Sequence, residues 1–332
     1  MKIKATYLKT DTGAKNKETK LHNKWLARLR EIGILLALLA VVSVFSALTP
    51  YFFSLSNLTN IVVQSSITGI ISVGMTLVII LGGIDLSVGS LVALVGVVIT
   101  TIMVNGVSVG LAILLGILIG AIVGLFNGSM ISRLGLQPFI VTLGSMSLLR
   151  GAALVYSHGD PIFKVSKEFR SIFAGTILGM PGPIFYLILV SAIGFFILNF
   201  TRYGVYIKAV GGSEEASKMS GVDIAWTKTF TYILSGIFTA LAALVMVGRL
   251  GAAEPIAGSG FELDAIAATA IGGTSMSGGK GNIPGTILGA LILGTLRNGL
   301  TLMNVQSFYQ VLASGAIILI AVTIDKLTHG KT

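Results

Sequence analysis

The chain has 332 residues, of which 54% are hydrophobic and only 11% are charged. An ordinary soluble domain has roughly 45–50% apolar and about 25% charged residues, so this composition excludes a soluble globular protein. The absence of cysteine excludes disulfides, thiolate metal sites and cysteine nucleophiles. The net charge of +10 is concentrated at the start of the chain, where nine of the 23 Lys and Arg precede residue 32. It therefore predicts no basic face for nucleic acid.

A polar, basic tail at 1–31 is followed by apolar segments along the rest of the chain. The stretch 32–132 contains a single charged side chain, Asp85. Segments of roughly 17–25 apolar residues are long enough to cross a bilayer. We expect an all-α, polytopic membrane bundle of about ten helices, some broken or re-entrant. The expected spans are 32–53, 57–81, 86–104, 108–132, 138–156, 183–200, 229–250, 262–274, 284–303 and 308–325.

These spans form one transmembrane domain at 32–326. Lys and Arg are enriched in the cytoplasmic loops of membrane proteins. With ten spans, 17 of the 23 Lys and Arg fall on the side that holds both termini, and three fall on the opposite side. We therefore expect both termini, the basic tail and the loop 201–228 to be cytoplasmic. The polar residues before the first apolar segment disfavour a cleavable signal peptide.

The sequence shows no catalytic apparatus. The nearest approach to a phosphate-binding loop, Thr274–Gly281, lacks glycine at its first position and Ser or Thr at its last. The three histidines are too scattered for a His-rich metal site. We expect no enzyme activity, and neither a cofactor nor a metal bound directly.

One span carries a regular row of glycines, which lie on one helix face because they recur at four-residue spacing. Small residues in this pattern let membrane helices approach closely. We prefer this packing role to a direct role in a solute pathway. The glycines are Gly116, Gly120, Gly124 and Gly128.

Asp85 is the first charge to consider, because charges inside a membrane are expensive and often functional. It follows Gly82 and Gly83 and precedes Ser87. Its carboxylate either caps the helix that begins there or takes part in gating.

Three more charges fall in or beside late spans. Glu262 and Asp264 begin the span 262–274, as helix-start carboxylates or as pathway residues. Arg297, beside Asn298, is expected to be buried and to need a carboxylate or backbone carbonyls as partner. These three charged residues and Asn298, together with the residues around Asp85, are the candidates for a pathway or gate.

The internal loop 201–228 contains the signals for a helix of about two turns. A serine N-cap, acidic residues in the first turn and a glycine stop mark it. A helix this short is unstable alone, so it either docks on a cytoplasmic partner or is an ordinary solvated loop helix. The candidate docking residues are Gly212, Ser213, Glu214, Glu215, Ala216 and Gly221.

Several segments resemble one family. Glu215–Gly221 is similar to the E-A-A-x-x-x-G loop of ABC importer permeases, with Ser217 in place of the second alanine. Val73–Ser90 and Phe261–Ala268 resemble signature segments of the ribose-type permeases of carbohydrate ABC importers, within the branched-chain amino acid/ribose-type family. So do Ile271–Ser275 and Gly278–Gly281. The likeness extends over about 32–326.

This resemblance implies a permease subunit in the bacterial cytoplasmic membrane that forms the pathway for a monosaccharide, with ribose as the first choice. It implies a cytoplasmic ATP-binding subunit that carries ATP and Mg²⁺ and docks on the loop helix. It also implies an extracytoplasmic sugar-binding protein and a second permease subunit, identical or related. The alternatives are an ion-coupled secondary sugar carrier that uses Asp85, Asp264 or Arg297 as a relay, and a passive channel.

Overall fold

The computed structural model describes residues 33–306, 308–313, 315–316, 319 and 323. The basic tail 1–31 and much of the span 308–325 lie outside the described residues. A helix at Gly33–Leu48 comes first. The elements that follow are α2 Leu55–Ile80, α3 Val88–Val104, α4 Val109–Arg133, α5 Pro138–Ser157, α6 Lys167–Ala174, β1 Thr176–Ile177, β2 Met180–Pro181, α7 Gly182–Phe200, α8 Arg202–Gly212, α9 Glu214–Met219, α10 Ile224–Leu250, α11 Phe261–Ile271 and α12 Ile283–Leu302.

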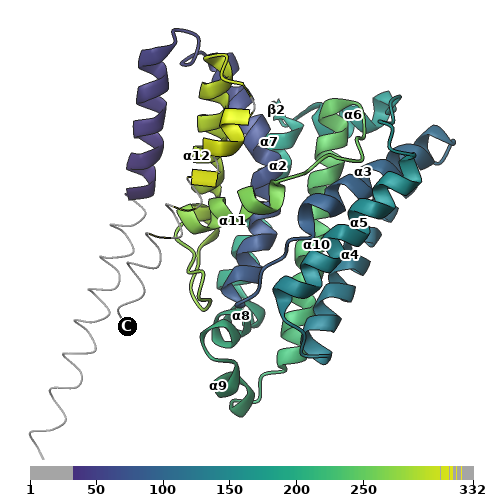
Figure 1. Cartoon of the computed structure of the whole chain (residues 1–332), viewed down its shortest axis with the longest axis vertical. Coiled ribbons are helices and arrows are strands. Elements are labelled where there is room, and N and C mark those ends of the chain that lie inside the picture. Colours follow the sequence, from purple (N-terminus) through teal and green to yellow (C-terminus); the bar gives the residue numbers. More distant parts are fainter. Residues whose placement is uncertain (1–32, 307, 314, 317–318, 320–322, 324–332) are drawn as a thin grey trace, which may run out of the picture.

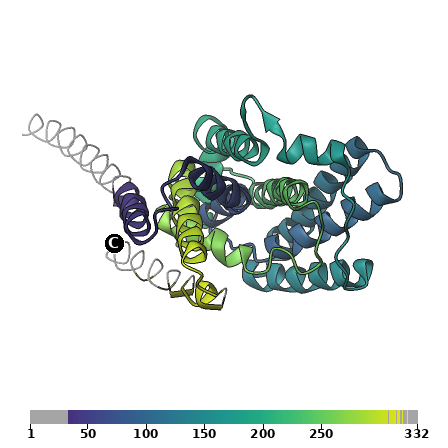
Figure 2. The ribbon, with the colours of Figure 1, turned by 90° about the horizontal axis from the view of Figure 1, so that it is seen from above.

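The helices form a bundle around α2 and α10 (Figure 1). Helix α10 packs against α4, α2 and α3, and α2 packs against α12, α7 and α11. The helix Gly33–Leu48 stands at the margin beside α12, as the view from above also shows (Figure 2). Helices α8 and α9 lie at one end of the bundle, and α6 with the antiparallel β1–β2 pair lies at the other. The two largest loops of the chain are therefore at opposite ends.

Six of the ten expected spans are confirmed as helices that are long and apolar enough to cross a membrane: α2, α4, α5, α7, α10 and α12. The count of about ten is not confirmed. Helix Gly33–Leu48 and α3 are shorter apolar helices. Helix α11 has 11 residues, about 16 Å at 1.5 Å per residue, against a hydrocarbon core of about 30 Å. This helix cannot cross alone, as the sequence led us to expect.

The distribution of apolar side chains fits a protein whose solvent is hydrocarbon. Most of α2 and α10 is buried, including Thr76, Ser235 and Thr239. Large apolar side chains instead lie exposed on the outer helices, where a soluble protein would carry charges. They include Leu111, Leu114, Leu118 and Ile122 on α4, Leu148 and Val155 on α5, and Ile188 and Phe196 on α7.

The glycine row of α4 faces α10. A Cβ on Gly120 would overlap the carbonyl of Gly236, and one on Gly236 would overlap the carbonyl of Gly120. A Cβ on Gly124 would overlap the main chain of Tyr232. The two backbones therefore touch, which confirms the packing role predicted for this row.

This contact gives the first prediction. Gly124→Leu forces a side chain into the α10 backbone, which cannot yield as a side chain can. It should lower stability by about 3 kcal/mol, the upper end for overpacking. Gly110→Leu, at a position in the same helix with nothing within 4 Å of a Cβ, is the matched control. Thermal unfolding in detergent measures both. Equal unfolding temperatures for the two variants would contradict the close contact.

Candidate functional site

The chain between α2 and α3 leaves helical geometry at 81–87. Gly82 has a φ of +91°, in the left-handed region that favours glycine. Gly83 lies so close to the Tyr232 hydroxyl of α10 that a Cβ there would overlap it. Glycine at both positions allows the chain to turn inside the bundle.

The Asp85 carboxylate lies buried in this break and receives three hydrogen bonds. Its Oδ1 accepts from the Ser87 amide at 3.1 Å and from the Ser87 hydroxyl at 2.5 Å. Its Oδ2 accepts from the Ser235 hydroxyl of α10 at 3.0 Å. Two further donors continue the chain: Asn127 of α4 donates to the Ser87 hydroxyl at 3.0 Å, and Ser145 of α5 donates to the Asn127 carbonyl at 2.5 Å.

These bonds all run in one direction. Ser145, Asn127 and Ser87 each donate to the next group, and the carboxylate is the final acceptor. The Asp85 carboxyl group accepts every bond that it makes in this network. Among the residues that the structure describes, no cation takes part, so hydroxyl and amide donors alone hold this group in place. The network joins the break to α4, α5 and α10.

The sequence left two readings of Asp85 open. The carboxylate does bind a main-chain amide, as a cap does, but the N-cap position of α3 belongs to Ser87, which makes no side-chain capping bond. Two of the three bonds to Asp85 come from Ser87 at the start of α3, and the third comes from Ser235 of α10, so Asp85 ties the start of α3 to α10 without being its N-cap. Its part in gating stays a hypothesis.

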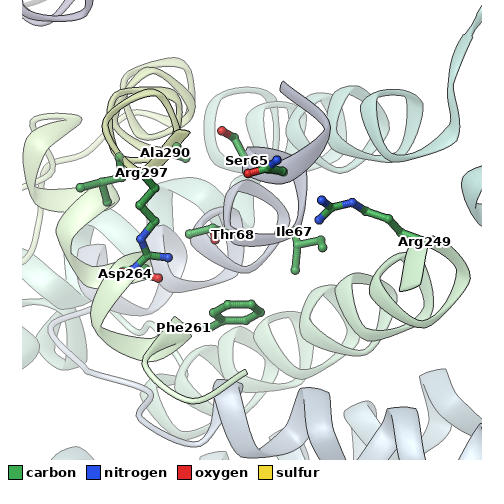
Figure 3. A pocket seen from close by; sticks show the side chains of 11 residues that line it. Ser65, Ile67, Thr68, Arg249, Phe261, Asp264, Ala290 and Arg297 are labelled. Carbon is green, nitrogen blue, oxygen red and sulfur yellow. Dashed lines mark hydrogen bonds and ion pairs between the residues drawn. The ribbon is translucent and has the colours of Figure 1, made fainter. Parts of the chain in front are cut away.

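A second group of candidates lines a pocket between α2, α10, α11 and α12 (Figure 3). Asp264 at the start of α11 pairs with Arg297 of α12, with 2.6 Å between its Oδ1 and Nη2. The Asp264 side chain is only 5% exposed, whereas that of Arg297 is 36% exposed. The expected carboxylate partner of Arg297 is thus present. The pocket has a volume of about 190 Å³.

Two other candidates lie outside this pocket. Glu262 accepts from the Gly260 amide at 3.2 Å and lies against Gly89 of α3. Asn298 exchanges amide hydrogen bonds of 2.9 and 3.0 Å with Asn57 near the start of α2. Both side chains join neighbouring segments, and neither lines the pocket with Asp264.

The predicted loop helix is present as α9, and α8 precedes it. Ser213 is the N-cap, with its side chain accepting from the Ala216 amide at 3.2 Å, and Gly221 has a φ of +80° after the helix end. Glu214 forms an ion pair of 2.7 Å with Lys228 of α10. Lys208 of α8 donates to the Leu198 carbonyl at 3.0 Å, and burial lowers its pKa. These bonds anchor the segment to the bundle.

Glycine-to-backbone contacts connect α8 with the break after α2. The Ile80 carbonyl accepts from the Gly279 amide at 2.8 Å. A Cβ on Gly211 would overlap this same carbonyl, and Gly278 packs against both Gly211 and Gly82. We call this meeting of 80–82, 211–212 and 278–279 the glycine junction.

Sequence reasoning missed several members of these sites. Arg249, near the end of α10, lines the pocket but had been assigned no role. Ser235 bonds Asp85 directly, and Asn127 and Ser145 connect to it through Ser87, from three different spans. Arg249 could have been found from the sequence, because a lone arginine in an apolar span often marks a functional site. Ser145 and Ser235 could not have been found, because serine is common in membrane helices.

A helical bundle with membrane-length apolar helices, broken helices and buried charges has the architecture of a multi-pass membrane protein. Residues 57–322 match the family described as branched-chain amino acid transport system / permease component. The chain belongs to this family, as its motifs had suggested.

Relatives cover nearly the whole chain. The ribose import permease protein RbsC of Escherichia coli K12 is 44% identical over 90% of this chain and 94% of its own length. RbsC of Bacillus subtilis 168 is 43% identical over 90% and 93%. The D-allose transport system permease protein AlsC of E. coli K12 is 41% identical over 89% and 91%. No solved structure matches the chain.

The network around Asp85 gives the second prediction. Asp85→Asn should assemble, because the amide oxygen keeps the Ser87 bonds and the Ser235 hydroxyl can rotate to accept from the new NH₂. Asp85→Leu should assemble poorly, because it leaves buried donors unpaired at about 1–3 kcal/mol each. Yield and thermal unfolding in detergent measure both. An Asp85→Leu protein as stable as the wild type would exclude the structural role, whereas an Asn variant that assembles but does not transport would favour gating.

Proposed function

We propose that the chain is the permease subunit of an ATP-binding-cassette importer and forms the pathway for ribose. The observation that carries this proposal is the 43–44% identity to ribose import permeases of two distant bacteria over nine tenths of the chain. A D-allose permease at 41% identity leaves another monosaccharide as an outcome of the test.

The proposed assembly has three partners. A separate cytoplasmic subunit binds and hydrolyses ATP, since this chain offers no phosphate loop. An extracytoplasmic binding protein delivers the sugar, and a second permease copy or close relative completes the pathway. The proposed topology has ten crossings of the cytoplasmic membrane with both termini inside, so that α8 and α9 face the cytoplasm and α6 faces outward.

Helix α9 has the properties of a docking element. Glu215 is exposed, and the Met219 side chain is 87% exposed on a helix of six residues. An apolar side chain so exposed at the end of the bundle suits a groove on a partner. The ion pair of Glu214 with Lys228 would hold α9 in place for that contact.

The glycine junction supplies a route from α9 to the pathway. A rigid contact between α8 and the Ile80 carbonyl transmits displacement, because main chain cannot rotate away as a side chain can. A shift of α8 would therefore move the break at 81–87 and the loop 272–282 together. The break at 81–87 holds Asp85, and the loop 272–282 joins α11, which carries Asp264, to α12, which carries Arg297.

Reconstitution tests the proposed function. The chain, its ATP-binding subunit and its sugar-binding protein are placed in proteoliposomes, and uptake of labelled ribose is measured. We expect uptake that needs ATP and the binding protein and that persists with an uncoupler. Uptake driven by an ion gradient would indicate a secondary carrier, and uptake that needs neither would indicate a channel. Either result would reject the importer.

The junction gives a prediction with a control in another helix. Gly211→Ala places a methyl group against the Ile80 carbonyl, whereas Gly110→Ala in α4 meets nothing within 4 Å. Gly211→Ala should reduce uptake about tenfold, with the subunits still copurifying, and Gly110→Ala should leave uptake within about twofold of wild type. Equal uptake by the two variants would show that the junction does not carry coupling.

A further inference from the structure

We propose that the pocket lined by Asp264, Arg297 and Arg249 is a binding site for one neutral monosaccharide within the permease itself. This inference rests on the proposed function and adds a site to it. The permease would then hold the sugar in transit and not merely enclose a passage.

The pocket lies in the half of the bundle away from α8 and α9. Helix α10 ends at α6, since Gly248 packs against Phe173 of α6. Arg249 follows directly and lines the pocket. Helix α2 begins and α12 ends at this same end (Figure 1), and Gln64 and Arg297 come from those parts. A sugar released at the outer face would meet this pocket early.

Two groups that line the pocket lack hydrogen-bond partners among the described residues, and one is an acceptor whereas the other is a donor. The Oδ2 of Asp264 is buried and has no hydrogen-bond partner among the described residues. Arg249 extends from α10 toward α2 (Figure 3) and has no hydrogen bond or ion pair to any described residue. One is an acceptor without a donor, and the other offers five N–H donors without an acceptor. The Asp264 oxygen is buried, and a buried acceptor without a donor is costly, whereas Arg249 is half-buried and its donors point to the pocket.

The chemistry of these two groups selects the ligand. An anion that only accepts hydrogen bonds could bind Arg249 but has no proton to donate to the Asp264 Oδ2, and a cation that only donates would do the reverse. A hydroxyl donates one hydrogen bond and accepts others, so a molecule with several hydroxyls can satisfy both groups at once. Arg297, paired with Asp264, forms the partly exposed side of the pocket.

Size and apolar lining agree with a sugar. The pocket of about 190 Å³ is smaller than those of drug-sized ligands, which start at about 300 Å³, so its size suits a monosaccharide better than a disaccharide. Phe261 lines it beside Asp264 (Figure 3). An aromatic ring offers an apolar surface to the C–H face of a sugar ring, while the polar groups fix its orientation.

The absence of natural cysteine makes a labelling experiment clean. Gln64→Cys places a single thiol at an exposed position on the pocket lining, and Ser171→Cys places one at an exposed position on α6, outside the pocket. Each variant is assembled with its partners in nanodiscs, and the rate of reaction with a charged thiol reagent is measured. The added solutes are D-ribose and, as the size control, sucrose at equal concentration.

We expect ribose to slow labelling at position 64 several-fold and sucrose to leave it unchanged, with neither affecting position 171. Adding Arg249→Met or Asp264→Asn to the Gln64→Cys chain should raise the ribose concentration for half protection by about tenfold, as expected for one lost hydrogen bond to a charged group. Two variants are used because either alone can disturb folding. Arg249→Lys, which keeps a cation near the end of α10, should weaken protection less than Arg249→Met.

The site is rejected if ribose gives no protection at position 64, if sucrose protects equally, or if both Arg249→Met and Asp264→Asn leave protection unchanged. ATP-driven uptake by wild-type proteoliposomes is measured in parallel. Normal uptake without protection would reject the sugar site in the pocket but not the importer function. Absence of uptake would reject the proposed importer function.

Discussion

A chain that interrupts its helices inside a bilayer must supply its own partners for the freed backbone groups, because hydrocarbon offers none. This constraint explains the region where α2 ends. The Ile80 carbonyl bonds to the Gly279 amide, and the turn at 81–87 is held by Asp85. The break is therefore a fixed feature that other segments must contact, and its partners come from far along the chain.

The need for internal hydrogen-bond partners also accounts for charged side chains inside the bundle. Asp85 accepts from the end of a chain of hydroxyl and amide donors, and Asp264 is balanced by Arg297. Asp85 lies in the break before α3, and Asp264 lies in the first turn of α11, which leads at its other end into the loop 272–282. The break before α3 and the loop 272–282 both contact α8 at the glycine junction. A membrane protein arranged in this way can pass movement from one end to buried polar groups without exposing them to lipid.

Much of the fold could be read from the sequence. The apolar lengths predicted six helices that the structure contains, and the four-residue spacing of Gly116 to Gly128 predicted close packing. The signals around Ser213 and Gly221 predicted α9. These features are local or periodic, so they can be predicted from residues that are close together in the sequence. The count of crossings was less secure, because α3 and α11 are shorter than a bilayer is thick and length alone does not decide whether such helices span.

The sequence by itself determined the membrane class, the helix positions and the family, because composition, apolar length and motif are properties of short segments. It also singled out Asp85, Asp264 and Arg297, because a charge in an apolar span is conspicuous. Only the tertiary structure decided their partners. Asp85 meets Ser235, 150 residues away, and Arg249 reaches the pocket of Asp264 from another helix. Such contacts depend on how helices pack, and packing brings together residues whose separation along the chain carries no signal.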